Sequence, residues 1–240
     1  MKILAALLCL IQLQPLSAQD WKPASADELL SRLDASAAKY KGMEHYEART
    51  TLLVYARAGD AQPSERGESR VWKVGTRAKA DHLGMISYQN EKVRVTIDKD
   101  DRVMVLAEPE EYVGLMGLEE RRAILGMASD IHVHAGVDGV HYRVRFPKGS
   151  EYDEVLFAFD PSGWLRRMET QWGNAVPLIP DNPLTDVILP RVVMELEPPR
   201  RIDPANVKAD PSEAVAFVNG KPQPTAAYRD FMVIDNRLRP

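Results

Sequence analysis

Cysteine is almost absent from this chain of 240 residues, because its one cysteine, Cys9, lies in an apolar stretch near the N-terminus. One cysteine cannot form an internal disulfide, and residues 19–240 offer no thiolate as a nucleophile.

Motifs of well-known chemistries are also missing. The sequence contains no Gly-x-Ser-x-Gly, no Gly-x-Gly-x-x-Gly and no phosphate-binding loop. The acidic residues Glu108, Glu110 and Glu111 stand at the start of an expected helix, where the helix dipole accounts for them. We therefore predict no catalytic residue and no cofactor.

Two partner classes are disfavoured by charge and hydropathy. The formal net charge is −4 and the basic residues are scattered, which argues against a nucleic-acid partner. After residue 18 no apolar run is long enough to cross a bilayer, so we expect a protein that does not span the membrane.

Residues 1–18 have the features of a secretory signal peptide. Lys2 supplies a positive charge, residues 3–13 are almost wholly apolar, and Ser17 and Ala18 are small residues at an expected cleavage site. This pattern predicts export, with cleavage after Ala18 or, as the alternative, after Gln19. An exported protein without disulfides is more typical of a bacterial periplasm than of a disulfide-rich extracellular scaffold, so we expect a periplasmic location.

The next segment is expected to be a helix over residues 25–41. Ser25 followed by Glu28 is a capping box, and Gly42 follows the last turn. Apolar residues recur at helical spacing and predict a buried stripe: Leu29, Leu30, Leu33, Ala37 and Tyr40.

Period-two alternation then predicts two groups of strands separated by a helical segment over residues 110–128. The first group is 46–56, 70–74, 77–83, 93–97 and 102–107, and the second is 131–135, 140–146, 154–159, 164–170 and 191–196. This order predicts an α+β fold, in which a strongly curved antiparallel sheet carries helices on its concave face. We assign residues 19–197 to this domain and 198–240 to a C-terminal extension with a final hairpin, across Asn219-Gly220, within residues 214–235.

Three histidines provide an alternative reading. His132 and His134 share one strand face and His141 lies on the next strand, which suits a metal-dependent exported enzyme as the alternative function. The alternating residues Ile131 and Val133 are apolar, however, and we expect the histidines on the polar face without a metal.

The order of elements resembles the LolA-like periplasmic carriers over roughly residues 25–197. Four stretches carry the resemblance: Ser31-Arg32-Leu33-Asp34, Val71-Trp72-Lys73, Ile97-Asp98-Lys99-Asp100, and the hairpin from Asp160-Pro161-Ser162-Gly163 to Glu169. The Arg-Pro step that the family shows after its second strand is missing here. The resemblance implies an incomplete β-barrel with an apolar concave face beneath helices, which holds a lipid or the acyl chains of a lipoprotein.

Alternation along the strands, together with a possible lid over residues 110–128, predicts the ligand-contacting wall. Its expected members are Leu52, Val54, Trp72, Val95, Ile97, Val103, Val105, Leu115, Met116, Phe157 and Phe159. The proline-rich stretch 177–190 and the tail 198–240 favour a different function, namely a LolA-like interaction or envelope-sensing module with a protein partner.

Overall fold

The computed structural model describes residues 20–82, 84–109, 118–177 and 187–237. The predicted signal peptide, residues 1–18, lies outside these ranges. The two helices are α1 (Ala26–Lys41) and α2 (Leu118–Gly126). The strands of the main sheet are β1 (Lys22–Pro23), β2 (His45–Tyr55), β3 (Glu65–Val74), β4 (Arg77–His82), β5 (Met85–Gln89), β6 (Arg94–Asp98), β7 (Val103–Ala107), β8 (Asp130–Gly136), β9 (Gly139–Arg145), β10 (Tyr152–Phe159), β11 (Leu165–Trp172), β14 (Arg191–Leu196), β15 (Arg200–Arg201) and β18 (Met232–Asp235).

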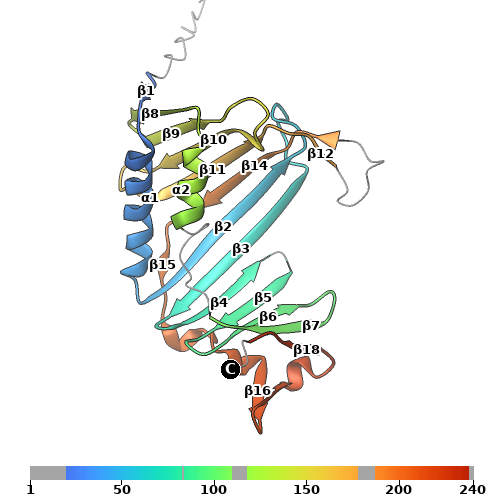
Figure 1. The fold of residues 1–240 in the computed structure, drawn as a ribbon. Coiled ribbons are helices and arrows are strands. Elements are labelled where there is room, and N and C mark those ends of the chain that lie inside the picture. The colour runs from blue at the N-terminus through green and yellow to red at the C-terminus, as the bar shows by residue number, and fades with distance from the viewer. Residues whose placement is uncertain (1–19, 83, 110–117, 178–186, 238–240) are drawn as a thin grey trace, which may run out of the picture.

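These strands form one strongly curved 14-stranded sheet in the order β1-β8-β9-β10-β11-β14-β2-β3-β4-β5-β6-β7-β18, with β15 beside β2 (Figure 1). Neighbouring strands are antiparallel except for β18, which runs parallel to β7. Within the described residues β1 and β18 are its two ends, so the sheet is open. The predicted curved antiparallel sheet is confirmed, and β5 is a strand that the sequence analysis missed.

Short elements complete the described chain. Two further strand pairs are β12 (Val176–Pro177) with β13 (Val187–Ile188), and β16 (Val215–Val218) with β17 (Lys221–Pro224). Single-turn 3-10 helices are η1 (Pro204–Asn206), η2 (Pro211–Glu213) and η3 (Ala226–Tyr228).

Helix α1 begins and ends as its sequence predicts. The Ser25 hydroxyl accepts a hydrogen bond from the Glu28 backbone N–H at 3.1 Å, which caps the first turn. The apolar stripe faces the sheet, where Leu29, Leu30 and Leu33 are buried. They pack with Leu125 of α2 and with apolar residues of β9–β11: Tyr142, Val144, Val155, Phe159 and Leu165.

A polar network holds α1 against β9. Tyr142 is completely buried, and its hydroxyl donates to Glu28 Oε1 at 2.8 Å and accepts from Arg32 Nε at 3.3 Å. Burial raises the pKa of Tyr142, and its hydrogen bond to Glu28 adds to the rise. The hydroxyl therefore stays protonated and satisfied while its ring fills the core.

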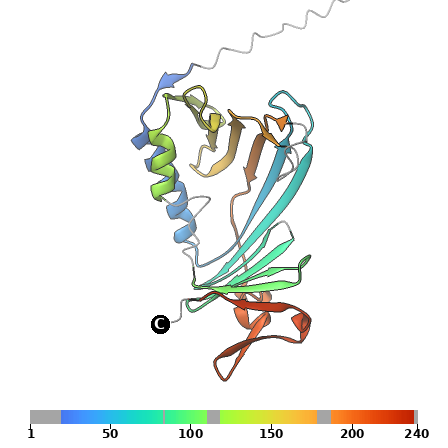
Figure 2. The same ribbon diagram turned by 45° about the vertical axis from the view of Figure 1, so that its right-hand side comes forward.

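Both helices contact the sheet mainly at one end. Figure 2 shows α1 and α2 next to each other on the inner, concave side of the sheet, and the apolar cluster that they complete lies on β9–β11. A helical cover over the remaining inner face of β2–β7 is not seen among the described residues.

The C-terminal residues cover the opposite face at the other end of the sheet. A second apolar cluster lies on β5–β7 beneath the tail: Ile86, Tyr88, Val93, Val95, Ile97, Met104, Leu106, Ala214 and Val215. Figures 1 and 2 show the red tail beneath these strands, away from α1 and α2. Burial raises the pKa of Tyr88, and the Tyr228 hydroxyl from the tail contributes.

The predicted final hairpin is shorter than expected. Asn219 and Gly220 have φ values of 53° and 75°, as a type I′ turn requires, and they join β16 to β17. The sequence prediction extended the hairpin to Asp235, but residues 232–235 form β18 and pair with β7. The tail is therefore joined to the main sheet by backbone hydrogen bonds, and not only by side chains.

Replacing Leu33 with Asp should unfold much of the protein, because it places an unpaired charge in the cluster under α1. We expect a loss of roughly 3 kcal/mol or more in the free energy of unfolding, measured by urea denaturation. Ala35, on the exposed side of α1, provides the control, since Ala35→Asp should cost about 0.5 kcal/mol or less. Similar losses for both variants would contradict the packing of α1.

Removing residues 204–240 should expose the outer apolar face of β5–β7. We expect a melting temperature lower by roughly 10 °C or more and strong binding of a hydrophobic dye. Phe217→Ser, at a side chain that is 43% exposed on the hairpin, should leave melting almost unchanged. A truncated protein that melts like the full chain and binds no dye would show that the tail does not cover this face.

Candidate functional site

The inner face of the sheet can be traced from strand to strand, because directly paired residues project from the same face. Phe157 of β10 pairs with Met168 of β11, which pairs with Met194 of β14, and Met194 pairs with Leu52 of β2. Phe157 also pairs with Tyr142, which packs beneath α1. This inner face therefore includes four of the predicted wall residues: Leu52, Val54, Phe157 and Phe159.

Followed further along the sheet, the same strand pairing places the other predicted wall residues on both faces. Val103 and Val105 lie on the inner face, half-buried on β7. Trp72, Val95 and Ile97 project from the outer face instead, and the last two are completely buried in the cluster beneath the tail.

The structure thus does not bring all the predicted residues onto one wall. A shift of one residue in register moves all the alternating apolar residues of a strand to the other face of the sheet. Alternation within one strand does not show which of the two faces its apolar residues share with those of the neighbouring strands. Leu115 and Met116 lie outside the described residues. Contact of any of these side chains with a ligand stays a prediction.

An apolar cavity of about 200 Å³ lies between α2 and the inner face of β10, β11 and β14. Its roof includes Ile124 and Leu125 of α2. The rest of its lining comes from the sheet and the loop after β9: Phe146, Tyr152, Val155, Phe157, Met168, Thr170, Trp172 and Val192.

Apolar side chains continue beyond the cavity. Val192, in its lining, pairs with Val54, and Met194 pairs with Leu52 two residues further along. All four are half-buried, so the inner face of β14 and β2 extends the cavity wall with accessible apolar surface.

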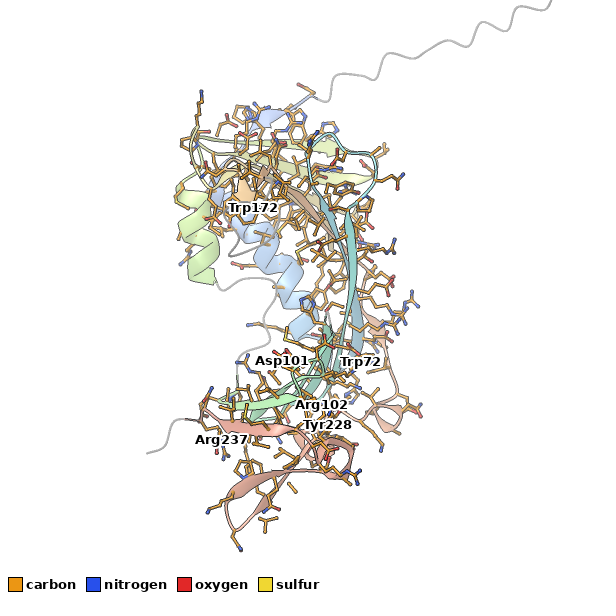
Figure 3. The ribbon with its side chains drawn as sticks, turned by 90° about the vertical axis from the view of Figure 1, so that its right-hand side faces the viewer. Trp72, Asp101, Arg102, Trp172, Tyr228 and Arg237 are labelled. Atoms are coloured by element: carbon orange, nitrogen blue, oxygen red, sulfur yellow. The ribbon has the colours of Figure 1, made fainter. Side chains whose placement is uncertain are left out.

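Few polar groups enter this lining, and they gather at one end. Thr170 and Trp172 are two residues apart and both project from the inner face of β11, beside Tyr152 of β10. Burial raises the pKa of Tyr152, and the nearby Glu151 carboxylate adds to the rise. Figure 3 shows Trp172 near α2, well away from Trp72 lower on β3.

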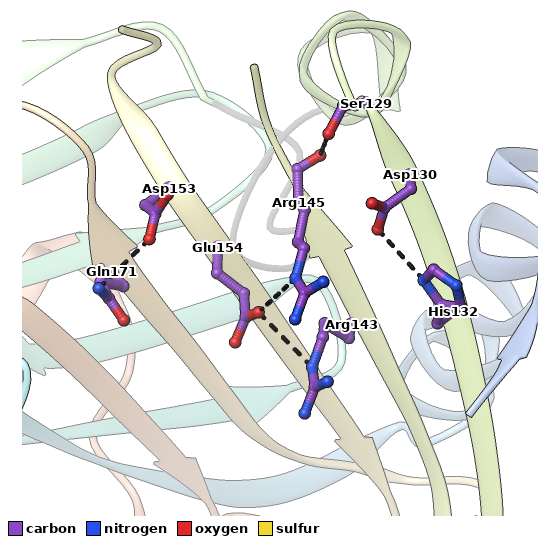
Figure 4. A network of polar contacts seen from close by, with 8 residues as sticks. All are labelled: Ser129, Asp130, His132, Arg143, Arg145, Asp153, Glu154 and Gln171. Carbon is purple, nitrogen blue, oxygen red and sulfur yellow. Dashed lines mark hydrogen bonds and ion pairs between the residues drawn. The ribbon is translucent and has the colours of Figure 1, made fainter. Parts of the chain in front are cut away.

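The outer face of the same strands is charged. Glu154 Oε2 lies 3.2 Å from Arg145 Nε and 3.5 Å from Arg143 Nε, as Figure 4 shows. In the same view Gln171 donates to Asp153 at 3.3 Å. Opposite faces of β9–β11 therefore have opposite chemistry, and the apolar cavity belongs only to the inner one.

The three histidines lie on this outer face. His132 lies 3.1 Å from Asp130 (Figure 4), and His141 lies 3.1 Å from Asp138. His134 and His141 are cross-strand partners with ring centroids 6.2 Å apart. The part of the chain that the structure describes contains no group of three His, Cys, Asp or Glu residues placed to hold a metal ion.

Several lining residues were not predicted from the sequence, although a signal for some was present. Val155 lies two residues before the predicted Phe157 on β10, and Met168 and Thr170 lie two residues apart within the predicted strand 164–170, so period-two alternation includes them. Trp172 lies beyond the end of that predicted strand. The contribution of Ile124 and Leu125 depends on where α2 packs, which strand alternation does not contain.

Comparisons with known proteins do not assign a family. No protein-family model matches the chain, and no curated protein is detectably similar in sequence. An uncharacterised conserved protein from Thermus thermophilus aligns with 88% of this chain and 99% of its own, at 11% identity and a TM-score of 0.40. The Mycobacterium tuberculosis lipoprotein LppX aligns with 78% of this chain and 100% of its own, at 13% identity and a TM-score of 0.35.

A DUF1329 family protein from Desulfovibrio piger aligns with 79% of this chain and 97% of its own, at 6% identity and a TM-score of 0.31. TM-scores from 0.31 to 0.40 are too low to assign a function to this chain. Among its described residues no helix is both long and apolar enough to cross a membrane.

Leu125, on the side of α2 that faces the sheet, is 5% exposed and lines the cavity, so Leu125→Ala should destabilise the protein by about 2–5 kcal/mol. Chemical denaturation measures this change. Met127, just past the end of α2, is 56% exposed, and Met127→Ala should cost about 0.5 kcal/mol or less. If Leu125→Ala is as mild as Met127→Ala, α2 does not pack on the sheet in solution.

Proposed function

We propose that this protein is exported to the periplasm and holds the acyl chain of a lipid or lipoprotein in the cavity under α2. The observation that carries the proposal is an apolar cavity of about 200 Å³ on the inner face of an open sheet. The signal-peptide pattern of residues 1–18 supports export, and the lack of cysteine after Cys9 suits the periplasm.

The size of the cavity suits part of an acyl chain. An apolar cavity of about 150 Å³ stays dry and binds benzene, so this one has room for a somewhat larger apolar group. The half-buried Val54, Leu52 and Met194 then offer surface for methylenes that extend beyond the cavity. Each buried methylene contributes about 0.8 kcal/mol, which allows reversible binding without an energy source.

The proposal is one of binding rather than catalysis. The residues that line the cavity include a threonine, a tyrosine and a tryptophan, but none with a carboxylate, imidazole, amine or thiol. General acid–base and nucleophilic catalysis most often use these missing groups, either at the reacting atoms or to activate a hydroxyl. Apolar burial is what this lining provides.

An envelope protein partner stays a prediction. The tail was one reason to expect an interaction module, but it covers the outer apolar face of β5–β7 and so has a structural role within this chain. Of the proline-rich stretch 177–190, residues 178–186 lie outside the described ranges.

Displacement of a fluorescent fatty acid from the purified protein tests the proposal. Val192→Phe should fill part of the cavity and weaken fatty-acid binding by about tenfold or more, because the larger side chain prevents the burial of several methylenes of the acyl chain. Leu53→Phe, on the neighbouring strand but the outer face, should bind within about twofold of wild type. Circular dichroism confirms that both variants fold.

Wild-type protein that neither binds the fluorescent fatty acid nor carries lipid in native mass spectrometry would overturn the proposed function. Equal weakening by Val192→Phe and Leu53→Phe would place the binding site outside this cavity.

A further inference from the structure

Trp172 has a donor without an acceptor. Its backbone N–H donates to the Pro190 carbonyl at 3.1 Å, but its indole Nε1 is covered from solvent and has no hydrogen-bond partner. A buried donor left unsatisfied costs free energy, because folding has taken it out of water without a replacement. Such a group in a native structure calls for an explanation.

The position of Trp172 distinguishes it from other unpaired donors in the described chain. Arg143 Nε and Arg191 Nε also lack hydrogen-bond partners, but both guanidinium groups form ion pairs on the outer face. Arg143 lies 3.5 Å from Glu154, and Arg191 lies 3.4 Å from Glu169. Trp172 instead lines the apolar cavity, where the protein supplies no charge.

The cavity is polar at one end and apolar at the other. Along β11 the inner-face residues run from Met168 through Thr170 to Trp172. Met168 is paired with Phe157, so the side chains at this end contain only carbon and sulfur. At the other end the lining residues include Thr170, with its hydroxyl, and Trp172, whose unpaired indole Nε1 is covered in this structure. Ligand pockets that are mostly apolar with a few placed polar groups fix the orientation of an amphiphile.

We infer that the ligand is an amphiphile with one oxygen acceptor, such as the carbonyl of an acyl group, and that Trp172 Nε1–H donates to this oxygen. The inference rests on the proposed function and adds the orientation of the ligand: the acceptor lies at Trp172 and the hydrocarbon extends toward Phe157 and Met168. Because Nε1 is covered in this structure, binding includes a shift of the side chains at this end.

Two probes of nearly the same shape test the hydrogen bond. 2-Acetylnaphthalene and 2-ethylnaphthalene differ mainly in one carbonyl oxygen, and their affinities are measured by displacement of the fluorescent fatty acid. The ratio of the two affinities should shift by roughly fivefold against the ketone in Trp172→Phe, because that variant keeps an aromatic ring but lacks the donor. Trp72→Phe, on the outer face, should leave the ratio unchanged.

Nitrogen-15 NMR of the indole N–H groups gives a second readout on wild-type protein. The ketone should move the Trp172 resonance downfield, and 2-ethylnaphthalene should not. Probes that bind with the same affinity ratio in wild type and Trp172→Phe, or a Trp172 resonance that responds equally to both, would overturn the inference and leave the proposed function standing. Failure of the fatty acid and both probes to bind would instead remove the proposed function itself.

Discussion

A large apolar area on either face of an open sheet is stabilised when another layer covers it, and this requirement organises both ends of the molecule. At the β9–β11 end the inner face is apolar, and α1 and α2 cover it. At the β5–β7 end the outer face is apolar, and the C-terminal tail covers it. Between these ends, β2 and β3 are mostly half-buried and connect two cores that lie on opposite sides of one sheet.

The cavity follows from how the inner face is covered. Tyr142, bonded to Glu28 and Arg32, places α1 directly on β9, and Arg32 also lies 5.9 Å from the ring centroid of Phe159. Helix α2 packs beside α1 and contacts the sheet through Leu125. Two helices cover a sheet this broad only in part, and the cavity lies next to α2, over β10, β11 and β14.

The contrast between the two faces of β9–β11 also confines any apolar ligand to one side. The outer face carries ion pairs such as Glu154 with Arg145, whose desolvation beneath a hydrocarbon would be costly. On the inner face, Trp172 combines a large apolar surface with one unpaired donor. This combination favours an amphiphile over a pure hydrocarbon, because a hydrocarbon leaves the N–H unsatisfied.

Local structure could be predicted from the sequence alone. The Ser25 cap and the stripe of Leu29, Leu30 and Leu33 specified α1, and period-two alternation located most strands, because both signals depend on residues close together in the chain. The turn at Asn219-Gly220 was found for the same reason. Strand β5 was missed, since Ser87 and Gln89 alternate with only Ile86 and Tyr88 over five residues between two turns.

Which face each strand buries was decided by tertiary structure. Val95 and Leu52 look alike in alternating sequence, yet Val95 packs beneath the tail and Leu52 faces the inner side, because strand pairing and register set their phase. Likewise, the sequence shows Leu125 and Trp172 only as apolar residues far apart in the chain. They line one cavity because α2 folds back over β11, a long-range contact that no local pattern encodes.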